Sequence, residues 1–243
     1  MLFLVRPALG EGPLSVVLDG PLPEGEASLE LPALPPGLVL DGEWLELPEH
    51  RYDSSLPFAG LTLDALGRST HLLRNLLTPG EHGPEEDRGA DASRFAKSFR
   101  VRFDLGLRCL TAGRFENAAE VLAGCGPGAT PSGDDALVGA VLAVHMLRAC
   151  GFAGLEETAR ALTRPTGNPL VRTFHTLALE GRVDAAFRGL VSAMVCGDEG
   201  ELGRAARRVL GQGATSGMDL LEGFLALLEG RLHTVESRGG EQC

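Results

Sequence analysis

Short apolar runs separated by turn residues characterise the first sixty residues of the chain. The runs are residues 2–5, 14–18, 27–31, 38–40 and 44–47. Runs of this length between Pro, Gly and Asp residues are typical of β-strands. The dipeptide Asp41-Gly42 between the last two runs favours a tight hairpin, because it readily adopts the positive φ angles of such turns. Residues 1–60 are therefore expected to form a small antiparallel sheet or partial barrel.

From Leu61 onward the apolar residues recur at helical spacing. Candidate helices cover residues 61–77, 93–111, 114–124, 133–150, 155–163, 169–180, 183–196, 199–210 and 217–229, and the polar stretch 81–92 is expected to be a loop. The predicted fold class is α+β, with the β-rich segment 1–60 packed on a mainly helical domain over residues 61–232. Residues 233–243 are expected to be a frayed tail.

Two of the candidate helices carry almost no charge. Between residues 136 and 147 the only strongly polar residue is His145, and between 218 and 228 the only charges are Asp219 and Glu222. A helix that is apolar on all faces lies in the middle of a bundle. These two helices are therefore expected to be central and buried.

Both of these helices begin with the same pattern, Ser-Gly-x-Asp-x-Leu-x-Gly, at Ser132 and at Ser216. The repetition indicates a duplicated helical unit or two convergent helix starts. The last glycines of the two copies, Gly139 and Gly223, occupy the same relative position. Because a glycine allows another helix to approach closely, the two helices are expected to pack against each other at these residues.

Two interpretations of the pattern stay open. In the first, Ser132 with Asp135 and Ser216 with Asp219 are capping boxes, in which the serine accepts a backbone N–H and the acid reaches back. An acid in the first turn also complements the positive end of the helix dipole. Under this interpretation the pattern only starts helices.

In the second interpretation the first copy binds a ligand, since capping does not require Gly126, Gly128, Thr130 or the second acid, Asp134. A glycine-rich helix entry can present backbone N–H groups to a phosphate or carboxylate. Asp134 and Asp135 would repel such an anion unless they bind Mg²⁺ or Mn²⁺, an arginine intervenes, or the acids accept hydrogen bonds from the substrate. The catalytic candidates are Ser132, Asp134 and Asp135, with the two acids also the metal candidates. The binding candidates are Gly126, Gly128, Thr130, Gly133, Ser216 and Asp219.

A weaker group of candidates lies in one predicted helix, at Arg172, Thr173 and His175. An arginine can bind a carboxylate or phosphate through two parallel hydrogen bonds. The alternative is a solvated arginine at the start of a helix. The usual signatures of NTPases, dinucleotide-binding proteins, zinc proteases and serine hydrolases do not occur in the sequence.

The composition makes several classes of binding partner poor candidates. The formal net charge is −11 and Lys97 is the only lysine, so nucleic acid and anionic membranes are poor candidates. The five cysteines show no zinc-ligand spacing, and no apolar run is long enough to span a bilayer. The short apolar start is not a signal-peptide core. A cytoplasmic protein without nucleic-acid or membrane partners is expected.

Residues 122–139 read LAGCGPGATPSGDDALVG, and residues 213–223 read GATSGMDLLEG. These two stretches resemble the signature elements of a bacterial family that includes the small third subunit of the oxamate carbamoyltransferase complex of anaerobic allantoin breakdown. The β-rich N-terminal segment is also similar to that family. The chain departs from the pattern at Ala129, where leucine is usual, and at Ala214, where histidine is usual.

The resemblance implies a purine-degradation reaction in which carbamoyl-oxamate and phosphate give oxamate and carbamoyl phosphate. It also implies partner subunits, one of them similar to succinyl-CoA synthetase, and a small anionic substrate. Such a reaction requires an anion cradle, a carboxylate clamp and donors for a developing oxyanion. The loop 126–135 is the candidate for the anion cradle or for the oxyanion donors, and Arg172 is the candidate for the carboxylate clamp. The alternative is a non-catalytic binding or assembly subunit whose Ser-x-x-Asp motifs only cap helices.

Overall fold

The structure, a computed structural model, describes residues 3–5, 11–13, 15–17, 29–30, 37–40, 42–46, 52–77 and 90–239. Helices dominate this part of the chain. They are α1 (Leu63–Leu77), α2 (Ala90–Thr111), α3 (Phe115–Leu122), α4 (Ser132–Ala149), α5 (Glu156–Leu162), α6 (Pro169–Leu179), α7 (Ala185–Cys196), α8 (Glu199–Leu210) and α9 (Ser216–Gly239). Most of the predicted loop 81–92 and the end of the predicted tail, residues 240–243, lie outside the described residues.

The predicted α+β class is wrong, and the fold is all-α. The described strands are two to four residues long: β1 (Phe3–Val5), β2 (Ser15–Val17), β3 (Leu29–Glu30), β4 (Gly37–Leu40) and β5 (Glu43–Glu46). β1 and β2 pair in parallel, whereas β3, β4 and β5 form an antiparallel set in that order. The antiparallel pairing expected on either side of Asp41-Gly42 is present, with Leu40 opposite Glu43, while Asp41 itself lies outside the described residues. The described core residues come from the helices and the segments between them.

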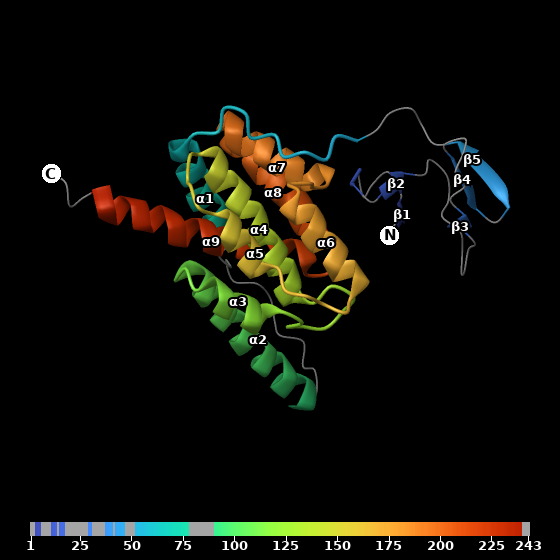
Figure 1. Cartoon of the computed structure of the whole chain (residues 1–243), viewed down its shortest axis with the longest axis horizontal. Helices are drawn as coiled ribbons and strands as arrows, with labels where there is room; N and C mark the ends of the chain where they lie inside the picture. Colours follow the sequence, from blue (N-terminus) through green and yellow to red (C-terminus); the bar gives the residue numbers. More distant parts are fainter. Residues whose placement is uncertain are drawn as a thin grey trace.

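Helices α4 and α9 cross in the middle of the bundle, with the other helices around them (Figure 1). A Cβ atom on Gly139 would overlap the carbonyl oxygen of Leu220, and one on Gly223 would overlap the carbonyl oxygen of Ala136. The two contacts are equivalent in the repeat, because Ala136 and Leu220 hold the same position in the two copies. The predicted packing of two central helices at these glycines is therefore confirmed.

Helices α6, α7 and α8 each begin at an acidic or amide cap. Asn168, Asp184 and Asp198 each accept hydrogen bonds from backbone N–H groups of the first turn of their helix. Such caps satisfy donors that have no partner inside the helix. Capping therefore fixes where these helices start, which in turn fixes the turn between α6 and α7.

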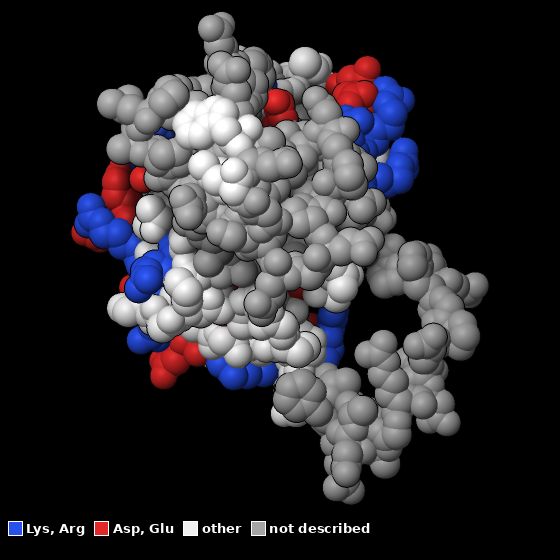
Figure 2. Space-filling view, turned by 90° about the vertical axis from the view of Figure 1, so that its right-hand side faces the viewer, with Lys and Arg blue, Asp and Glu red and all other residues white. Residues whose placement is uncertain are grey.

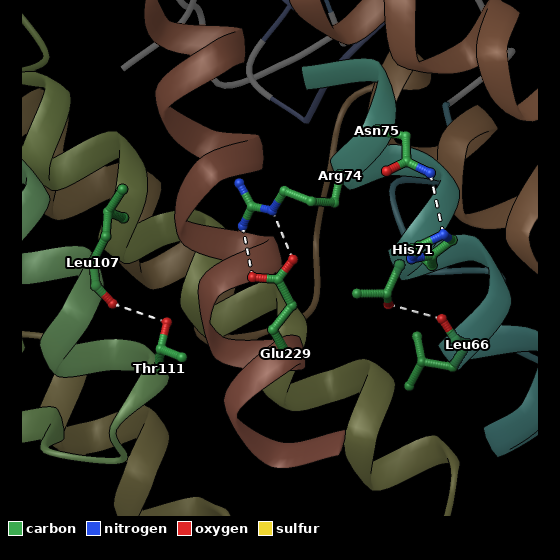
Figure 3. Close-up of polar contacts among 8 residues, drawn as sticks. Leu66, His71, Arg74, Asn75, Leu107, Thr111 and Glu229 are labelled. Carbon is green, nitrogen blue, oxygen red and sulfur yellow. Dashed lines mark hydrogen bonds and ion pairs between the residues drawn. The ribbon is translucent and has the colours of Figure 1, made fainter. Parts of the chain in front are cut away.

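Helix α1 is attached to α9 by a two-pronged ion pair. The Arg74 guanidinium donates to both carboxylate oxygens of Glu229, at 2.6 and 2.9 Å (Figure 3). The Thr70 hydroxyl donates to the carbonyl of Leu66 one turn earlier in α1. On the face shown in Figure 2, acidic and basic side chains of described residues lie next to one another at the margins.

The N-terminal region contacts the turn between α6 and α7 through its backbone. Leu56 N–H donates to the Gly181 carbonyl, Val183 N–H to the Ser54 carbonyl, and Ala185 N–H to the Glu11 carbonyl, at 2.8–3.2 Å. These bonds place residues 11–13 beside the helical bundle, where they form part of the site described next. Within the described ranges, no helix combines the length and apolarity needed to cross a bilayer.

Candidate functional site at the starts of α4 and α9

The loop before α4 contains three glycines with positive φ angles, +65° at Gly124, +118° at Gly126 and +103° at Gly128. Residues with a side chain rarely adopt such angles. A Cβ on Gly126 would also lie 2.9 Å from the Ser132 nitrogen and 3.2 Å from a ring carbon of Phe99. The backbone path and packing therefore explain the requirement for glycine at Gly126, without a ligand.

The first N–H groups of α4 are bonded within the chain. Gly133 N–H donates to the Cys125 carbonyl at 2.7 Å, and the N–H groups of Asp134 and Asp135 donate to the Pro131 carbonyl at 2.9 and 3.1 Å. An anion at this helix start would have to compete with these bonds. The expected cradle of Gly126, Gly128 and Gly133 stays a prediction.

The predicted capping role of Ser132 does not occur in α4. The cap position is Pro131, and no side chain accepts a hydrogen bond there. Ser132 is the first residue of the helix and is buried. The acids of the first turn are therefore free of capping and serve other contacts.

Asp134 stabilises the loop that precedes α4. Its side chain is buried, and one carboxylate oxygen accepts the Gly124 N–H at 3.0 Å. Burial raises the pKa of Asp134, and this hydrogen bond and the neighbouring His175 and Arg102 act in the opposite direction. Asp134 does not line the cavity described below.

The side chain of Asp135 lies in a different environment from that of Asp134. It lines a cavity of about 350 Å³, together with Thr130 from the loop and Ser216 from α9. The hydroxyls of Thr130 and Ser216 lie 3.4 Å apart, which brings the two helix starts together. Asp135 Oδ2 is buried and has no hydrogen-bond partner among the described residues. A buried acceptor without a partner is unfavourable and marks a position where a ligand donor would bind.

The environment of Asp135 favours the protonated acid. Burial raises its pKa to about 7; hydrogen bonds from Ser216 and Thr130 oppose this shift, and the nearby Asp219 and Asp134 add to it. A carboxyl group with such a pKa can donate or accept a proton near neutral pH. A strongly perturbed acid in a cavity is a candidate for function.

The rest of the cavity is mostly apolar. Its larger apolar side chains on the helices come from α4, α6, α7 and α9: Val138, Leu142, Phe174, Leu177, Phe187 and Leu220. The remaining polar lining includes Glu11, Arg182 and Asp184. Arg182 donates to Glu180 at 3.0 Å and to the Ser54 hydroxyl at 3.2 Å. This mixture of an apolar interior with a few polar groups is typical of small-molecule sites.

The structure does not bring the α6 candidates to the cavity. Arg172 is exposed, and the hydroxyls of Thr173 and Thr176 donate to backbone carbonyls of their own helix. His175 is only 6% exposed, and neither ring nitrogen has a hydrogen-bond partner among the described residues. Burial lowers the pKa of His175, while the nearby Asp134 carboxylate opposes that shift. His175 is therefore buried near Asp134 and lies outside the cavity.

Asp219 is the counterpart of Asp135 in the second copy. It is 6% exposed, and its Oδ2 has no partner among the described residues. It does not line the cavity, although its charge contributes to the raised pKa of Asp135.

The structure supports no multidentate metal centre in its described part: no group of three or more His, Cys, Asp or Glu side chains there is arranged to hold a metal ion. The proposed Mg²⁺ or Mn²⁺ ligands Asp134 and Asp135 differ in their surroundings. Asp134 already accepts a backbone N–H, whereas Asp135 has a carboxylate oxygen without a partner. Metal binding stays a prediction. Of the two acids, Asp135 has the carboxylate oxygen that is available as a metal ligand.

Sequence reasoning missed the charged side chains that line the cavity beside Asp135: Glu11, Arg182 and Asp184. They carry no motif, and they meet only because the N-terminal region bonds to the α6–α7 turn. The helical cap at Asp184 was the one available signal, since a polar residue before an apolar run predicts a helix start.

Residues 122–228 match the family described as oxamate carbamoyltransferase subunit AllH. The similarity to that family covers less than half of the chain. The matched segment contains α4 and α9 and therefore both copies of the repeat, but it excludes Glu11. The match confirms the resemblance predicted from the glycine-rich motif. No curated protein and no solved structure matches the chain.

Proposed function

We propose that this chain is a subunit of an oxamate-carbamoyltransferase-like complex, and that the cavity at Asp135 binds the small-molecule substrate. The family match supports membership of such a complex. The observation that carries the binding site is the buried Asp135 oxygen without a partner, in a cavity shared by the two halves of the family motif.

The proposed reaction transfers the carbamoyl group of carbamoyl-oxamate to phosphate. A phosphate oxygen forms a bond to the carbamoyl carbon, the bond from that carbon to the oxamate nitrogen breaks, and the nitrogen takes up a proton. Asp135, protonated in part near neutral pH, is suited to supply that proton or to hold the amide group in place. Arg182 is the cation that lines the same cavity and can balance a substrate carboxylate.

The complex is proposed to contain partner subunits, one similar to succinyl-CoA synthetase, and to act in purine degradation in the cytoplasm. Co-purification of this chain with such a subunit from cells that carry the genes for both tests that part. Mg²⁺ or Mn²⁺ is a candidate cofactor. Titration of the chain with either ion, with Asp135→Asn as the comparison, tests it.

A second candidate is a non-catalytic assembly subunit. The supporting observation is that Gly126, Gly133 and Asp134 all have structural contacts that explain them without a ligand. The two candidates differ in what they predict for Asp135, which has no such structural partner at Oδ2.

The test is carbamoyl phosphate formation by the reconstituted complex, with Asp135→Asn compared with Asp134→Asn. The proposal expects Asp135→Asn to lower kcat/KM by about 100-fold or more, since removing a positioned proton donor typically has an effect of this size. Asp134→Asn retains an acceptor for Gly124 and should keep activity once the protein is folded. If Asp135→Asn turns over like the parent while assembly is intact, the assembly role is the correct one.

A further inference from the structure

The lining of the cavity changes from polar to apolar along α4. Asp135, Val138 and Leu142 all line it, at positions i, i+3 and i+7 of one helix face. With a rise of about 1.5 Å per residue, this face runs about 10 Å from a carboxyl group at the helix start to an aliphatic wall. The polar end and the apolar wall are thus parts of one continuous surface.

The same order is found on α9, where Ser216 at the helix start is followed by Leu220 one turn later. The two polar ends meet, because the Ser216 hydroxyl lies 3.4 Å from that of Thr130. Phe174 and Leu177 from α6 and Phe187 from α7 extend the apolar wall. The cavity therefore has a polar end at the two helix starts and an apolar part beyond it.

The apolar part is not filled by the residues that the structure describes. Val138, Phe174, Leu177 and Leu220 are only half-buried, although they line the interior of this cavity. Half-buried apolar side chains around a cavity of about 350 Å³ gain stability when an apolar group covers them. Oxamate carries no apolar group, and placing its polar atoms against these walls would leave them without hydrogen bonds.

We infer that the ligand of this cavity is a small amide or ureido compound with an apolar body, such as one aromatic ring or a branched alkyl group. The inference rests on the cavity assigned under the proposed function. The amide or ureido N–H groups bind the Asp135 carboxyl and the hydroxyls of Thr130 and Ser216. The apolar body lies along the aliphatic and aromatic walls. The substrate is therefore a substituted relative of carbamoyl-oxamate, which keeps the ureido group of the proposed reaction and adds the apolar body.

Calorimetric titration of the full-length chain with oxamate and with N-phenyloxamate is the test, since the two probes differ only in the ring. N-phenyloxamate should bind at least about tenfold more tightly, because burying a ring of this size contributes at least that factor. Val138→Phe, which fills the apolar part from α4, should remove the difference between the two probes. Leu177→Phe fills it from α6 and serves as the second variant if Val138→Phe does not fold.

The control is Leu105→Phe, which adds the same ring at an exposed position of α2 and should keep the preference. Equal binding of the two probes, or a preference that survives both cavity-filling variants in folded protein, overturns the inference. Absence of binding by both probes at millimolar concentration overturns it as well. Carbamoyl transfer by the reconstituted complex is a separate measurement, so each of these results leaves the proposed function to its own test.

Discussion

The starts of α4 and α9 have the same packing geometry but different side chains. A Cβ on Gly133 would overlap the carbonyl oxygen of Leu122 at the end of α3, and one on Gly217 would overlap that of Val209 at the end of α8. Each helix start is thus pressed against the end of the preceding helix. Between the shared glycine and the shared acid, α4 has Asp134, which is 6% exposed, whereas α9 has Met218, which is 36% exposed.

This difference separates the packing role of the repeated glycines from the contacts that the first loop alone makes. The residues that the two copies share, such as Gly139 and Gly223, lie at helix crossings where only glycine fits. The residues that only the first copy has include Asp134, which holds the loop, and Thr130, which lines the cavity. A change at a shared glycine should therefore affect stability, and a change at Asp134 or Thr130 should affect the first loop or the site.

The largest effect is expected at the shared glycines. Gly139→Ala and Gly223→Ala should each lower the free energy of unfolding by about 3 kcal/mol or more, because the added methyl group overlaps a backbone carbonyl that cannot move away locally. Urea unfolding followed by circular dichroism measures the change.

The matched control is Gly67→Ala in α1, where a Cβ would have no neighbour within 4 Å. Alanine is favoured over glycine inside a helix by up to about 1 kcal/mol, so this variant should be slightly more stable than the parent. If the α4 and α9 variants behaved like Gly67→Ala, the close crossing of the central helices would be incorrect.

Asp134, which the second copy of the motif replaces with Met218, should show the next largest effect on stability. Asp134→Ala removes the buried acceptor of the Gly124 N–H and should lower the free energy of unfolding by about 1–3 kcal/mol. Met218→Ala at the matching place in α9 should change it by less than about 1 kcal/mol, since that side chain is partly exposed. Thermal unfolding of the two variants compares them directly. Equal effects would mean that Asp134 has no special role in the first loop.

The helices, the central pair and the glycine crossing could be predicted from the sequence, because they depend on local apolar spacing and on residues without side chains. The fold class could not, because the described strands in the first sixty residues are only two to four residues long, and pairing strength depends on partners that local sequence does not reveal. The motif residues Thr130, Asp135 and Ser216 line the cavity that we propose as the site. The different surroundings of Asp134 and Asp135 depend on Gly124 and Ser216, which only the folded chain brings to them.

The pH dependence of stability should distinguish Asp135 from a simple capping acid. Burial raises its pKa from 3.8 in the unfolded chain to about 7, so between about pH 4 and 7 the folded chain keeps a proton that the unfolded chain has lost. This contribution to stability is complete below pH 4 and is lost as the pH rises through 7. Asp135→Asn does not titrate, so its stability relative to the parent should be at least about 1 kcal/mol higher at pH 8 than at pH 5. Urea unfolding at the two pH values measures this. A capping acid would give the opposite sign, because a dipole and an N–H bond lower its pKa.

The smallest effect is expected at a contact that the structure shows only for the first loop. Asn168 Nδ2 donates to the Ala129 carbonyl at 2.8 Å, while its Oδ1 caps α6 through the N–H groups of Leu170 and Val171. Asn168→Asp keeps the cap but replaces the donor with an acceptor, so it should lower the free energy of unfolding by about 0.5–1.5 kcal/mol. Asn168→Ala loses both contacts and should lower it by about 1 kcal/mol more, the typical contribution of a helix cap. Differential scanning calorimetry of the two variants separates the loop contact from the cap. If Asn168→Asp were as stable as the parent, the bond to Ala129 would not help to hold the first loop, and the difference between the two helix starts would rest on Asp134 and Thr130 alone.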